Sequence, residues 1–504
     1  MTRGRDWKSL PWVLVGLLVL GAVLRFGTLG LQSYRYDEAV TVVRVIHPSL
    51  FDTLAAVPRS ESTPPLYYAL AWLWSRAFGT SEVGLRSLSA LAGTASIAVV
   101  YLSARALPLP RRGSLIAAAI VAVSPVLIWF SQDARAYALV FLLTALSFWL
   151  FARARQSGSR QDLGWWVATS SLALLTHYFA AFVVVPEAAL LLLGHQYPAD
   201  GPIRQGSLDV PARRRELLAV GVVVATGVLL MPIALRQAEN AHAGWIAEQP
   251  LGQRLERAAA KLAGNDNGDE HGKRQPGPIP LGIPLALALA ALVLLLARGD
   301  PDERRGGALA GAVGAVGVGL PLLIGAFGVD YLDGRNLIPV LVPLVVLLGA
   351  GFGVRRAGRL GLALAAAFCL CSLVFTIEID RLPRLQREDL RNAAHEIEPL
   401  RPGTAVVTIR YAINQPLRYY LGGRFAGGER LALREIDLIG SASAERSAHR
   451  LLPAAFHRVE SKPVSYDFTL ARFRAARTVN VPLRLLERGA LVGGGPRASV
   501  LVAP

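Results

Sequence analysis

Long apolar runs separated by short polar links are the dominant pattern of this 504-residue chain. The runs are roughly 17–22 residues long, the length of α-helix that crosses a bilayer core of about 30 Å. The pattern therefore predicts a polytopic α-helical membrane protein with about eleven transmembrane helices. The predicted helices are 10–30, 84–106, 113–130, 136–152, 164–179, 180–196, 216–235, 279–297, 307–328, 337–353 and 360–379.

Two long polar segments interrupt this pattern on the same side of the membrane. The first, 31–83, contains the apolar and aromatic stretch 66–78, which is too short to span a bilayer and predicts an interfacial or re-entrant helix. The second, 236–278, has a polar tip at 264–273 with the composition of turns and disorder. The acidic residues and histidine of that tip match no calcium loop or zinc pattern, so we expect a solvated loop.

The composition changes after residue 380, where charged and mixed sequence replaces the apolar runs. We expect a transmembrane domain over 1–380, with outer loops 31–83 and 236–278, followed by a small extracytoplasmic α/β domain over 381–504. The predicted elements of the second domain are helices at 385–397 and 413–421 and strands at 405–410 and near 481–485.

The net charge of +17 reports membrane topology, because the basic residues cluster in every second link between apolar runs. The positive-inside rule assigns such links to the cytoplasm, which places the N-terminus inside and residues 381–504 outside. No nucleic-acid partner is needed to explain the charge. Cys369 and Cys371 both lie in the last apolar run and have neither a disulfide framework nor a metal-site spacing.

An acidic pair, Asp37 and Glu38, follows the first predicted helix on the outer face, next to Tyr36. One interpretation is an ordinary polar loop beside the membrane. The other is catalytic, because a carboxylate near apolar surroundings has a raised proton affinity that suits a general base.

Further candidates lie at other outer helix ends. Arg335 precedes the helix 337–353, where topology statistics disfavour arginine and a guanidinium can bind a phosphate. Asp133 and Arg135 lie in the turn after 113–130 and can equally form a helix-capping pair. His177 and Tyr178 lie in the turn between 164–179 and 180–196, where a structural role competes with a functional one.

Several short motifs share this outer placement and occur in a recognisable order. They are Tyr36-Asp37-Glu38, the stretches 62–68 and 131–137, Thr176-His177-Tyr178, and the stretches 335–339 and 386–391. With these motifs the chain resembles the GT-C membrane glycosyltransferases, and it is most similar to the bacterial relatives of protein O-mannosyltransferases and lipid A aminoarabinose transferases. The resemblance covers roughly residues 10–425.

This resemblance implies an enzyme of the bacterial plasma (inner) membrane that uses a sugar linked to a polyprenyl phosphate. It implies that Asp37 is the general base, that Glu38 orients it or binds acceptor hydroxyls, and that the sugar moves with inversion to an unknown extracytoplasmic acceptor. Arg335 and Arg135 would bind the donor phosphate. Tyr36, Asp133, His177 and Tyr178 are the candidates for the acceptor or sugar pocket.

No cofactor is implied, and although two adjacent carboxylates can hold a divalent metal, the related families suggest that none is required. Two other classes of function stay open. A transporter or lipid flippase would carry paired charges in mid-membrane, which the predicted helices 113–130, 180–196, 279–297 and 307–328 lack. A non-catalytic assembly protein would tolerate the loss of Asp37 and Glu38.

Overall fold

The computed structural model describes residues 12–193, 210–239, 249–263, 279–327, 331–409, 413–422, 429–440, 450–466, 468–492 and 497–503. The polar tip 264–273, which the sequence predicts to be a solvated loop, lies outside these residues. The chain forms two compact units: unit 1 comprises residues 1–29 and 48–381, and unit 2 comprises 30–47 and 382–504. Unit 2 therefore includes part of the predicted outer loop 31–83 together with the predicted C-terminal domain.

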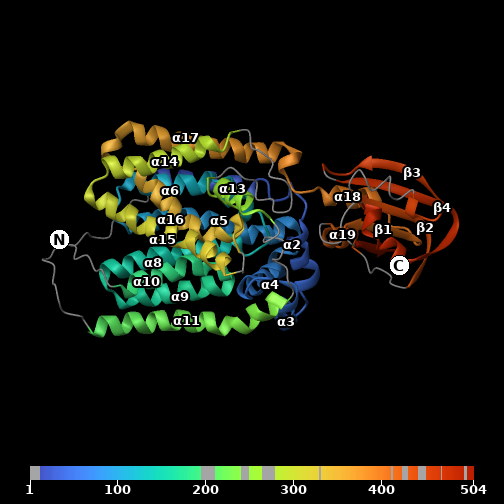
Figure 1. Cartoon of the computed structure of the whole chain (residues 1–504), viewed down its shortest axis with the longest axis horizontal. Helices are drawn as coiled ribbons and strands as arrows, with labels where there is room; N and C mark the ends of the chain where they lie inside the picture. Colours follow the sequence, from blue (N-terminus) through green and yellow to red (C-terminus); the bar gives the residue numbers. More distant parts are fainter. Residues whose placement is uncertain are drawn as a thin grey trace. The chain divides into compact units, whose positions relative to one another are not determined.

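Unit 1 is helical, and its longer helices run side by side (Figure 1). Each of the predicted transmembrane segments coincides with a helix or with two consecutive helices. The helices are α1 (Trp12–Phe26), α3 (Leu50–Ser60), α4 (Leu66–Phe78), α5 (Glu82–Arg105), α6 (Arg111–Val123), α7 (Pro125–Ser131), α8 (Tyr137–Ser157), α9 (Arg160–Thr176), η2 (Tyr178–Ala180), α10 (Ala181–Leu192), α11 (Val210–Glu239), α13 (Leu251–Leu262), α14 (Gly282–Arg298), α15 (Pro301–Ala326), η3 (Gly334–Val340), α16 (Leu341–Phe352), η4 (Arg355–Ala357) and α17 (Gly358–Arg381).

Among the described residues, 6 helices are long and apolar enough to cross a membrane, or 7 if the bent pair α6–α7 is one span. The shorter apolar helices are Trp12–Phe26, Tyr178–Leu192 and Gly282–Arg298. The number of about eleven spans is therefore a prediction that the helix lengths alone do not confirm. The predicted short helix at 66–78 is confirmed as α4.

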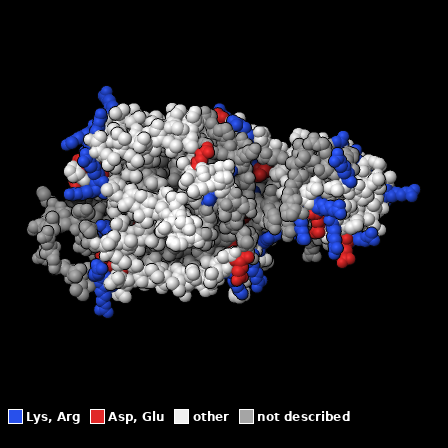
Figure 2. All heavy atoms as spheres, viewed as in Figure 1, with Lys and Arg blue, Asp and Glu red and all other residues white. Residues whose placement is uncertain are grey.

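The outer surface of unit 1 is apolar where a bilayer would contact it. Exposed side chains of α11 include Leu217, Leu218, Val228 and Leu229. Figure 2 shows few charged side chains over the middle of this unit and a group of Lys and Arg at the end drawn on the left. An apolar band with basic residues at one end is typical of a helical membrane protein.

The predicted helix 113–130 is broken, and this is a correction to the sequence analysis. α6 and α7 are bent by 56° at Ser124, which is the N-cap of α7 and is followed by Pro125. Proline has no backbone N–H, so the carbonyl of Val121 loses its normal helical partner four residues later. A buried carbonyl without a partner would cost free energy comparable to a lost hydrogen bond.

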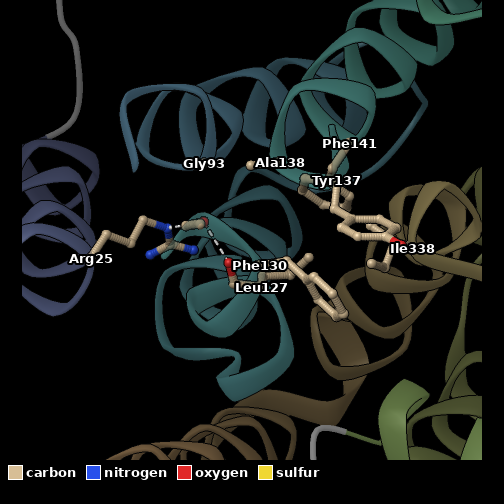
Figure 3. Close-up of a pocket in the computed structure, with 9 residues that line it drawn as sticks. Arg25, Gly93, Leu127, Phe130, Tyr137, Ala138, Phe141 and Ile338 are labelled. Atoms are coloured by element: carbon tan, nitrogen blue, oxygen red, sulfur yellow. Dashed lines mark hydrogen bonds between the residues drawn. The ribbon is translucent and has the colours of Figure 1, made fainter. Parts of the chain in front are cut away.

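Arg25 supplies the missing donors from α1. Its guanidinium is fully buried, and it donates to the carbonyl oxygens of Val121 (2.8 Å) and Ala122 (3.0 Å) and to the hydroxyl of Ser131 (3.1 Å; Figure 3). The next carbonyl, that of Val123, accepts a weaker bond from the Thr376 hydroxyl of α17 at 3.4 Å. The charged residue inside the first apolar run thus donates hydrogen bonds to the carbonyls that the break between α6 and α7 leaves without helical partners.

The last turn of α1 also accepts hydrogen bonds from the residue that follows α7. The side-chain amide of Gln132, directly after α7, donates to the carbonyls of Leu24 (3.1 Å) and Arg25 (3.2 Å) at the last turn of α1. On its other side, α7 approaches α5 so closely that a glycine is required there. A Cβ on Gly93 of α5 would lie 2.0 Å from the Ser131 hydroxyl. The turn that carries Asp133 and Arg135 is therefore held on both sides.

Unit 2 contains a five-stranded sheet of order β3-β4-β2-β1-β5. The strands β1 and β2 are parallel, and the other pairs are antiparallel. Its elements are α2 (Tyr36–Val40), η1 (Thr41–Val45), η5 (Pro383–Leu385), α18 (Leu390–Ile397), β1 (Thr404–Ile409), α19 (Asn414–Leu421), β2 (Arg430–Gly440), β3 (Phe456–Pro463), β4 (Thr469–Pro482), α21 (Leu483–Leu486), η6 (Gly489–Val492) and β5 (Ala498–Val502).

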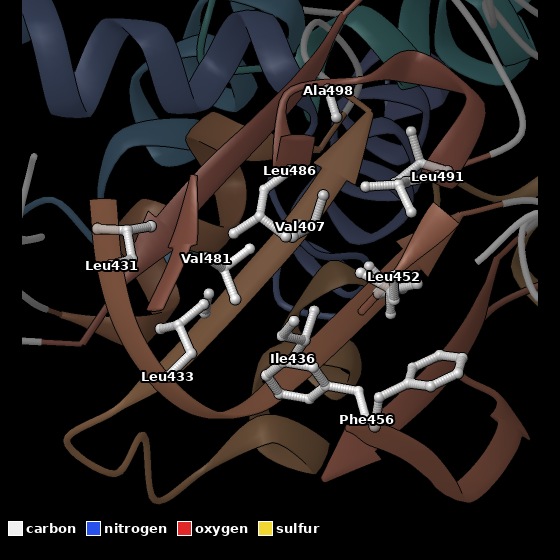
Figure 4. Packing of buried hydrophobic residues seen from close by; sticks show 14 of the residues in the cluster. Val407, Leu431, Leu433, Ile436, Leu452, Phe456, Val481, Leu486, Leu491 and Ala498 are labelled. Carbon is white, nitrogen blue, oxygen red and sulfur yellow. The ribbon is translucent and has the colours of Figure 1, made fainter. Parts of the chain in front are cut away.

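Apolar side chains cover both faces of this sheet. One face buries Val407, Ile436 and Phe456 with Leu486 and Leu491 (Figure 4). The other face packs against α18 and α19 through residues that include Ala393, Leu417 and Val406. A β-bulge between Leu433 and Glu435 explains why Leu433 and Ile436, three residues apart, share a face.

The elements predicted for the C-terminal domain are partly confirmed. The helices and the strand at 405–410 correspond to α18, α19 and β1. The strand predicted near 481–485 is wrong beyond Pro482, because β4 ends there and α21 follows. The strands β2, β3 and β5 were not predicted, and β3 has mostly exposed or half-exposed side chains rather than a regular alternation.

Removing the guanidinium that donates to the carbonyls at the α6–α7 break should destabilise unit 1. Arg25→Met leaves two buried carbonyls without these donors, and each unsatisfied group costs about 1–3 kcal/mol. We expect a lower melting temperature in detergent, measured by intrinsic fluorescence, whereas Arg298→Met at an exposed position should stay within about 0.5 kcal/mol of wild type. Equal melting temperatures for the two variants would refute this role of Arg25.

Candidate active site

The first group of candidates, Tyr36, Asp37 and Glu38, forms the first turn of the short helix α2 in unit 2. The Glu38 carboxylate accepts a hydrogen bond from the backbone N–H of Arg35 (3.2 Å), which satisfies a donor at the start of this helix. The side chain of Asp37 lies 3.9 Å from the Arg35 guanidinium. A local capping interaction therefore explains why the chain turns into a helix here.

The two carboxylates have different surroundings. The side chain of Asp37 is 26% exposed, whereas that of Glu38 is fully buried and lies 3.5 Å from the Arg387 guanidinium. Asp37 is thus the more accessible carboxylate of the pair, and Glu38 has an ion-pair partner that sequence reasoning missed.

The remaining candidates belong to unit 1. Asp133 and Arg135 both lie in the turn after α7, and both are buried. The Arg135 guanidinium binds the carboxylate of Glu61 at 2.5 Å, a partner that a simple capping pair with Asp133 does not include. Glu61 directly precedes the stretch 62–68, but sequence reasoning did not select it.

Aromatic and hydroxyl groups surround this ion pair. The Arg135 guanidinium lies over the ring of Tyr68, 6.0 Å from its centre, and the Tyr68 and Thr63 hydroxyls are 2.8 Å apart. Burial raises the pKa of Tyr68. Tyr68 is therefore a neutral hydrogen-bonding group beside a charged pair.

Arg335 lies in η3, next to a second acidic residue. Asp333 caps η3 by accepting from the backbone N–H of Arg335 (2.9 Å), and its carboxylate lies 3.9 Å from the Arg335 guanidinium and 3.8 Å from the Lys261 ammonium. Burial by itself would raise the pKa of Asp333, but these two cations and the backbone bond outweigh it, and the pKa is lowered. Asp333 is therefore a carboxylate with two cations beside it.

Lys261 reaches this position from α13, an amphipathic helix in the loop predicted over 236–278. Its side chain is only 3% exposed and packs so closely on η3 that a Cβ at Gly334 would lie 2.3 Å from the Lys261 side chain. Sequence reasoning missed Lys261 because the charge of an amphipathic helix is normally solvated. Only the packing of α13 against η3 brings it to Arg335.

His177 and Tyr178 make local contacts at the turn between α9 and α10. The imidazole Nδ1 of His177 accepts from the backbone N–H of Phe179 (3.3 Å), so the side chain caps η2. The Tyr178 hydroxyl donates to the side-chain oxygen of Gln237 on α11 (2.8 Å). These contacts give both residues a structural role, and the prediction that they bind sugar or acceptor stays a prediction.

The two arginines predicted to bind phosphate both influence the pKa of His177. Burial, together with charge repulsion from Arg135 and Arg335, lowers the pKa of His177 to about 3. The fold thus brings these arginines, which are far apart in the sequence, to one neutral imidazole. A neutral histidine at this position neither adds charge nor repels an anion.

A buried carboxyl group occurs away from these residues, in α10. Glu187 accepts hydrogen bonds from the Trp166 indole N–H (2.9 Å) and from the Ser147 hydroxyl. Its helix belongs to the segments that the sequence analysis described as lacking paired charges. Glu187 is a single mid-helix acid whose bonds join α8, α9 and α10.

No group of three or more His, Cys, Asp or Glu side chains that could hold a metal ion occurs in the part of the chain that the structure describes. The prediction that the site has no metal stays a prediction.

Comparison with known proteins gives two kinds of match. Residues 62–200 match the family described as dolichyl-phosphate-mannose-protein mannosyltransferase. The fold matches ArnT from Cupriavidus metallidurans in the apo state with a TM-score of 0.57 at 11% identity, over 92% of this chain and 97% of that chain. The same protein bound to undecaprenyl phosphate matches with a TM-score of 0.53 at 12% identity, over 92% and 98%. No curated protein matches the sequence.

The resemblance to the GT-C membrane glycosyltransferases is confirmed. The fold agrees over nearly the whole of both chains, and the family match covers the segment from the stretch 62–68 to beyond α10. At these identities the ArnT likeness shows the fold alone, so the substrates and the residue roles are matters for a proposal.

The lowered pKa of His177 predicts how stability depends on pH. An unfolded histidine takes up a proton below pH 6.5, while His177 in the fold stays neutral until about pH 3, so acid favours the unfolded chain in this window. At pH 5 this amounts to about 2 kcal/mol. We expect the melting temperature of wild type to fall more between pH 7 and pH 5 than that of His177→Asn, which keeps an acceptor for the η2 cap. Parallel pH profiles would contradict this account.

Proposed function

We propose that this protein is a membrane glycosyltransferase that moves a sugar from a polyprenyl-phosphate donor to a hydroxyl group of an extracytoplasmic acceptor. The observation that carries the proposal is the agreement of the fold with ArnT over 92% of this chain, since one of the matched structures has undecaprenyl phosphate bound. The family match over residues 62–200 names a mannosyltransferase that uses a lipid-phosphate sugar and supports the same donor class.

In this proposal Asp37 is the general base. Its carboxylate takes the proton of the acceptor hydroxyl as the oxygen attacks the anomeric carbon of the sugar. The bond between that carbon and the phosphate oxygen breaks on the opposite side, so the configuration inverts and polyprenyl phosphate leaves. The partial exposure of Asp37 supports this assignment over Glu38, whose carboxylate is buried against Arg387.

The departing phosphate requires cations, and Arg335 and Arg135 are the candidates in this proposal. Arg335 is the stronger candidate, because Lys261 shares its neighbouring acid Asp333 and leaves this group with one net positive charge. Arg135 is neutralised by Glu61, so it would bind phosphate only by exchanging that partner or by sharing it. A guanidinium that meets the charge developing on the leaving oxygen lowers the transition-state energy.

The location follows from the same reasoning. We assign the protein to the bacterial plasma membrane as a multi-pass protein, with the N-terminus in the cytoplasm and residues 381–504 outside. The basic side chains at one end of unit 1 support this orientation through the positive-inside rule (Figure 2). An activated sugar outside the membrane must arrive on a lipid, which agrees with the proposed donor.

Removal of the base tests the proposed reaction. Asp37→Asn cannot accept the proton, so we expect the rate of sugar transfer to fall by about 10²–10⁴ while the donor still binds. The measurement is transfer from synthetic polyprenyl-phosphate sugars by purified protein in detergent, with donor hydrolysis followed in parallel. Asp302→Asn, at an exposed position, is the matched control. Near-normal transfer by Asp37→Asn would remove Asp37 from this role, and donor binding without turnover in all variants would favour a lipid carrier.

Loss of the residue proposed to bind the donor phosphate should lower the efficiency with which the enzyme uses the donor. Arg335→Met removes a charge-assisted hydrogen bond worth about 1.5–3 kcal/mol, so we expect kcat/KM for the donor to fall roughly ten- to hundredfold. Arg335→Lys keeps the charge but loses the two parallel N–H groups, so its kcat/KM should lie between those of wild type and Arg335→Met. An unchanged kcat/KM for Arg335→Met, with Arg298→Met as the control, would exclude a phosphate role.

A further inference from the structure

The sequence motif 386–391 lies against the first outer loop within unit 2. The backbone N–H of Arg387 donates to the Gln32 side chain (2.8 Å), and the Ser33 hydroxyl donates to the carbonyl of Glu388 (2.6 Å) and accepts from the N–H of Leu390 (3.0 Å). The Arg391 guanidinium donates to the carbonyl of Gly30 (3.0 Å). This motif therefore binds the side chains of Gln32 and Ser33 and the backbone carbonyl of Gly30.

A second contact lies one step further along the loop. The backbone N–H of Tyr34 donates to the Tyr420 hydroxyl (2.7 Å), and the Tyr34 ring meets the Tyr419 ring edge to face at 5.1 Å. Both tyrosines belong to α19, which packs on α2. The segment just before α2 is thus attached to the C-terminal sequence on two sides.

The side chain of Arg387 continues past these backbone contacts to α2 itself. Its guanidinium lies 3.5 Å from the Glu38 carboxylate, and the two side chains are 3% and 0% exposed. The same Glu38 carboxylate accepts from the N–H of Arg35 and so caps α2. A charge pair out of contact with water is only weakly screened, and loss of one partner leaves the other buried and uncompensated.

Asp37 is the residue next to Glu38 on the same turn of α2. We propose that Arg387 is a positioning residue for the transfer reaction: through its ion pair with Glu38 it fixes α2 and so the direction of the Asp37 carboxylate. This inference rests on the proposed function, in which Asp37 is the base. It assigns to the C-terminal sequence a part in catalysis without contact to the substrate, and it gives Glu38 the role of an intermediary.

The chain allows the ion pair to be removed while the loop contacts remain. Arg387→Met keeps the backbone N–H that binds Gln32, and it keeps most of the buried volume. Glu38→Gln keeps an oxygen that can accept from the N–H of Arg35. Arg401→Met removes an exposed arginine of the same unit and serves as the matched control.

The experiment compares these full-length variants in detergent by steady-state transfer kinetics and by hydrogen exchange of residues 34–41. A displacement of a catalytic group by about 1 Å can cost about 10² in rate. We expect Arg387→Met and Glu38→Gln each to lower kcat by about this factor, with the KM for donor changed less than about twofold. Exchange over 34–41 should become faster, and Arg387→Lys should recover part of kcat.

The double variant, Arg387→Met with Glu38→Gln, separates positioning from general destabilisation. If the two side chains act as one unit, its kcat should be no lower than that of the worse single variant. Wild-type kcat in Arg387→Met, or a loss of kcat with unchanged exchange over 34–41, would overturn the proposal. The proposal would also be overturned if the fold-loss of kcat in the double variant equalled the product of the two single losses.

Failure of the proposed function has a different signature. Full activity of Asp37→Asn would refute the base, and the exchange of residues 34–41 in Arg387→Met would still report whether the ion pair fixes α2. A dead Asp37→Asn beside a fully active Arg387→Met would retain the base and refute the positioning role.

Discussion

The satisfaction of backbone carbonyls inside an apolar bundle is the constraint on which unit 1 depends. The break between α6 and α7 frees carbonyls that neither water nor lipid can serve, and the Arg25 guanidinium binds two of them. This explains an arginine inside the first apolar run without any catalytic role. Because the same guanidinium binds Ser131, it also fixes the end of α7, from which the turn with Asp133 and Arg135 begins.

The candidate residues of each unit follow a related rule, since their buried charges occur with partners. Arg135 is paired with Glu61, Asp333 lies between Arg335 and Lys261, and Glu38 is paired with Arg387. Such pairs add little net stability, because desolvation opposes their attraction. Their consequence is geometric: each one fixes the side chains beside it, and in unit 2 the neighbour is Asp37.

Some elements were predictable because their signals are local. The apolar runs, the short aromatic helix α4 and the strand β1 depend on length and composition, and the structure contains them. The break at Ser124 has a local signal too, a Ser-Pro pair, but a long apolar run obscured it. The strands β2 and β3 have charged side chains such as Glu435 and Glu460, which reduce the hydrophobic alternation, and Arg472 of β4 binds both carboxylates across the sheet.

By itself, the amino-acid sequence determined the membrane class, the positions of the helices and the acidic and basic residues at their ends. These properties depend on the local run of apolar and charged side chains and on motifs of a few residues. Only the tertiary structure decided which charges become partners: Arg135 with Glu61, Lys261 with Asp333, and Glu38 with Arg387, the last pair 349 positions apart along the chain. The physical reason is that an ion pair depends on distance and burial, and the packing of helices and strands sets both.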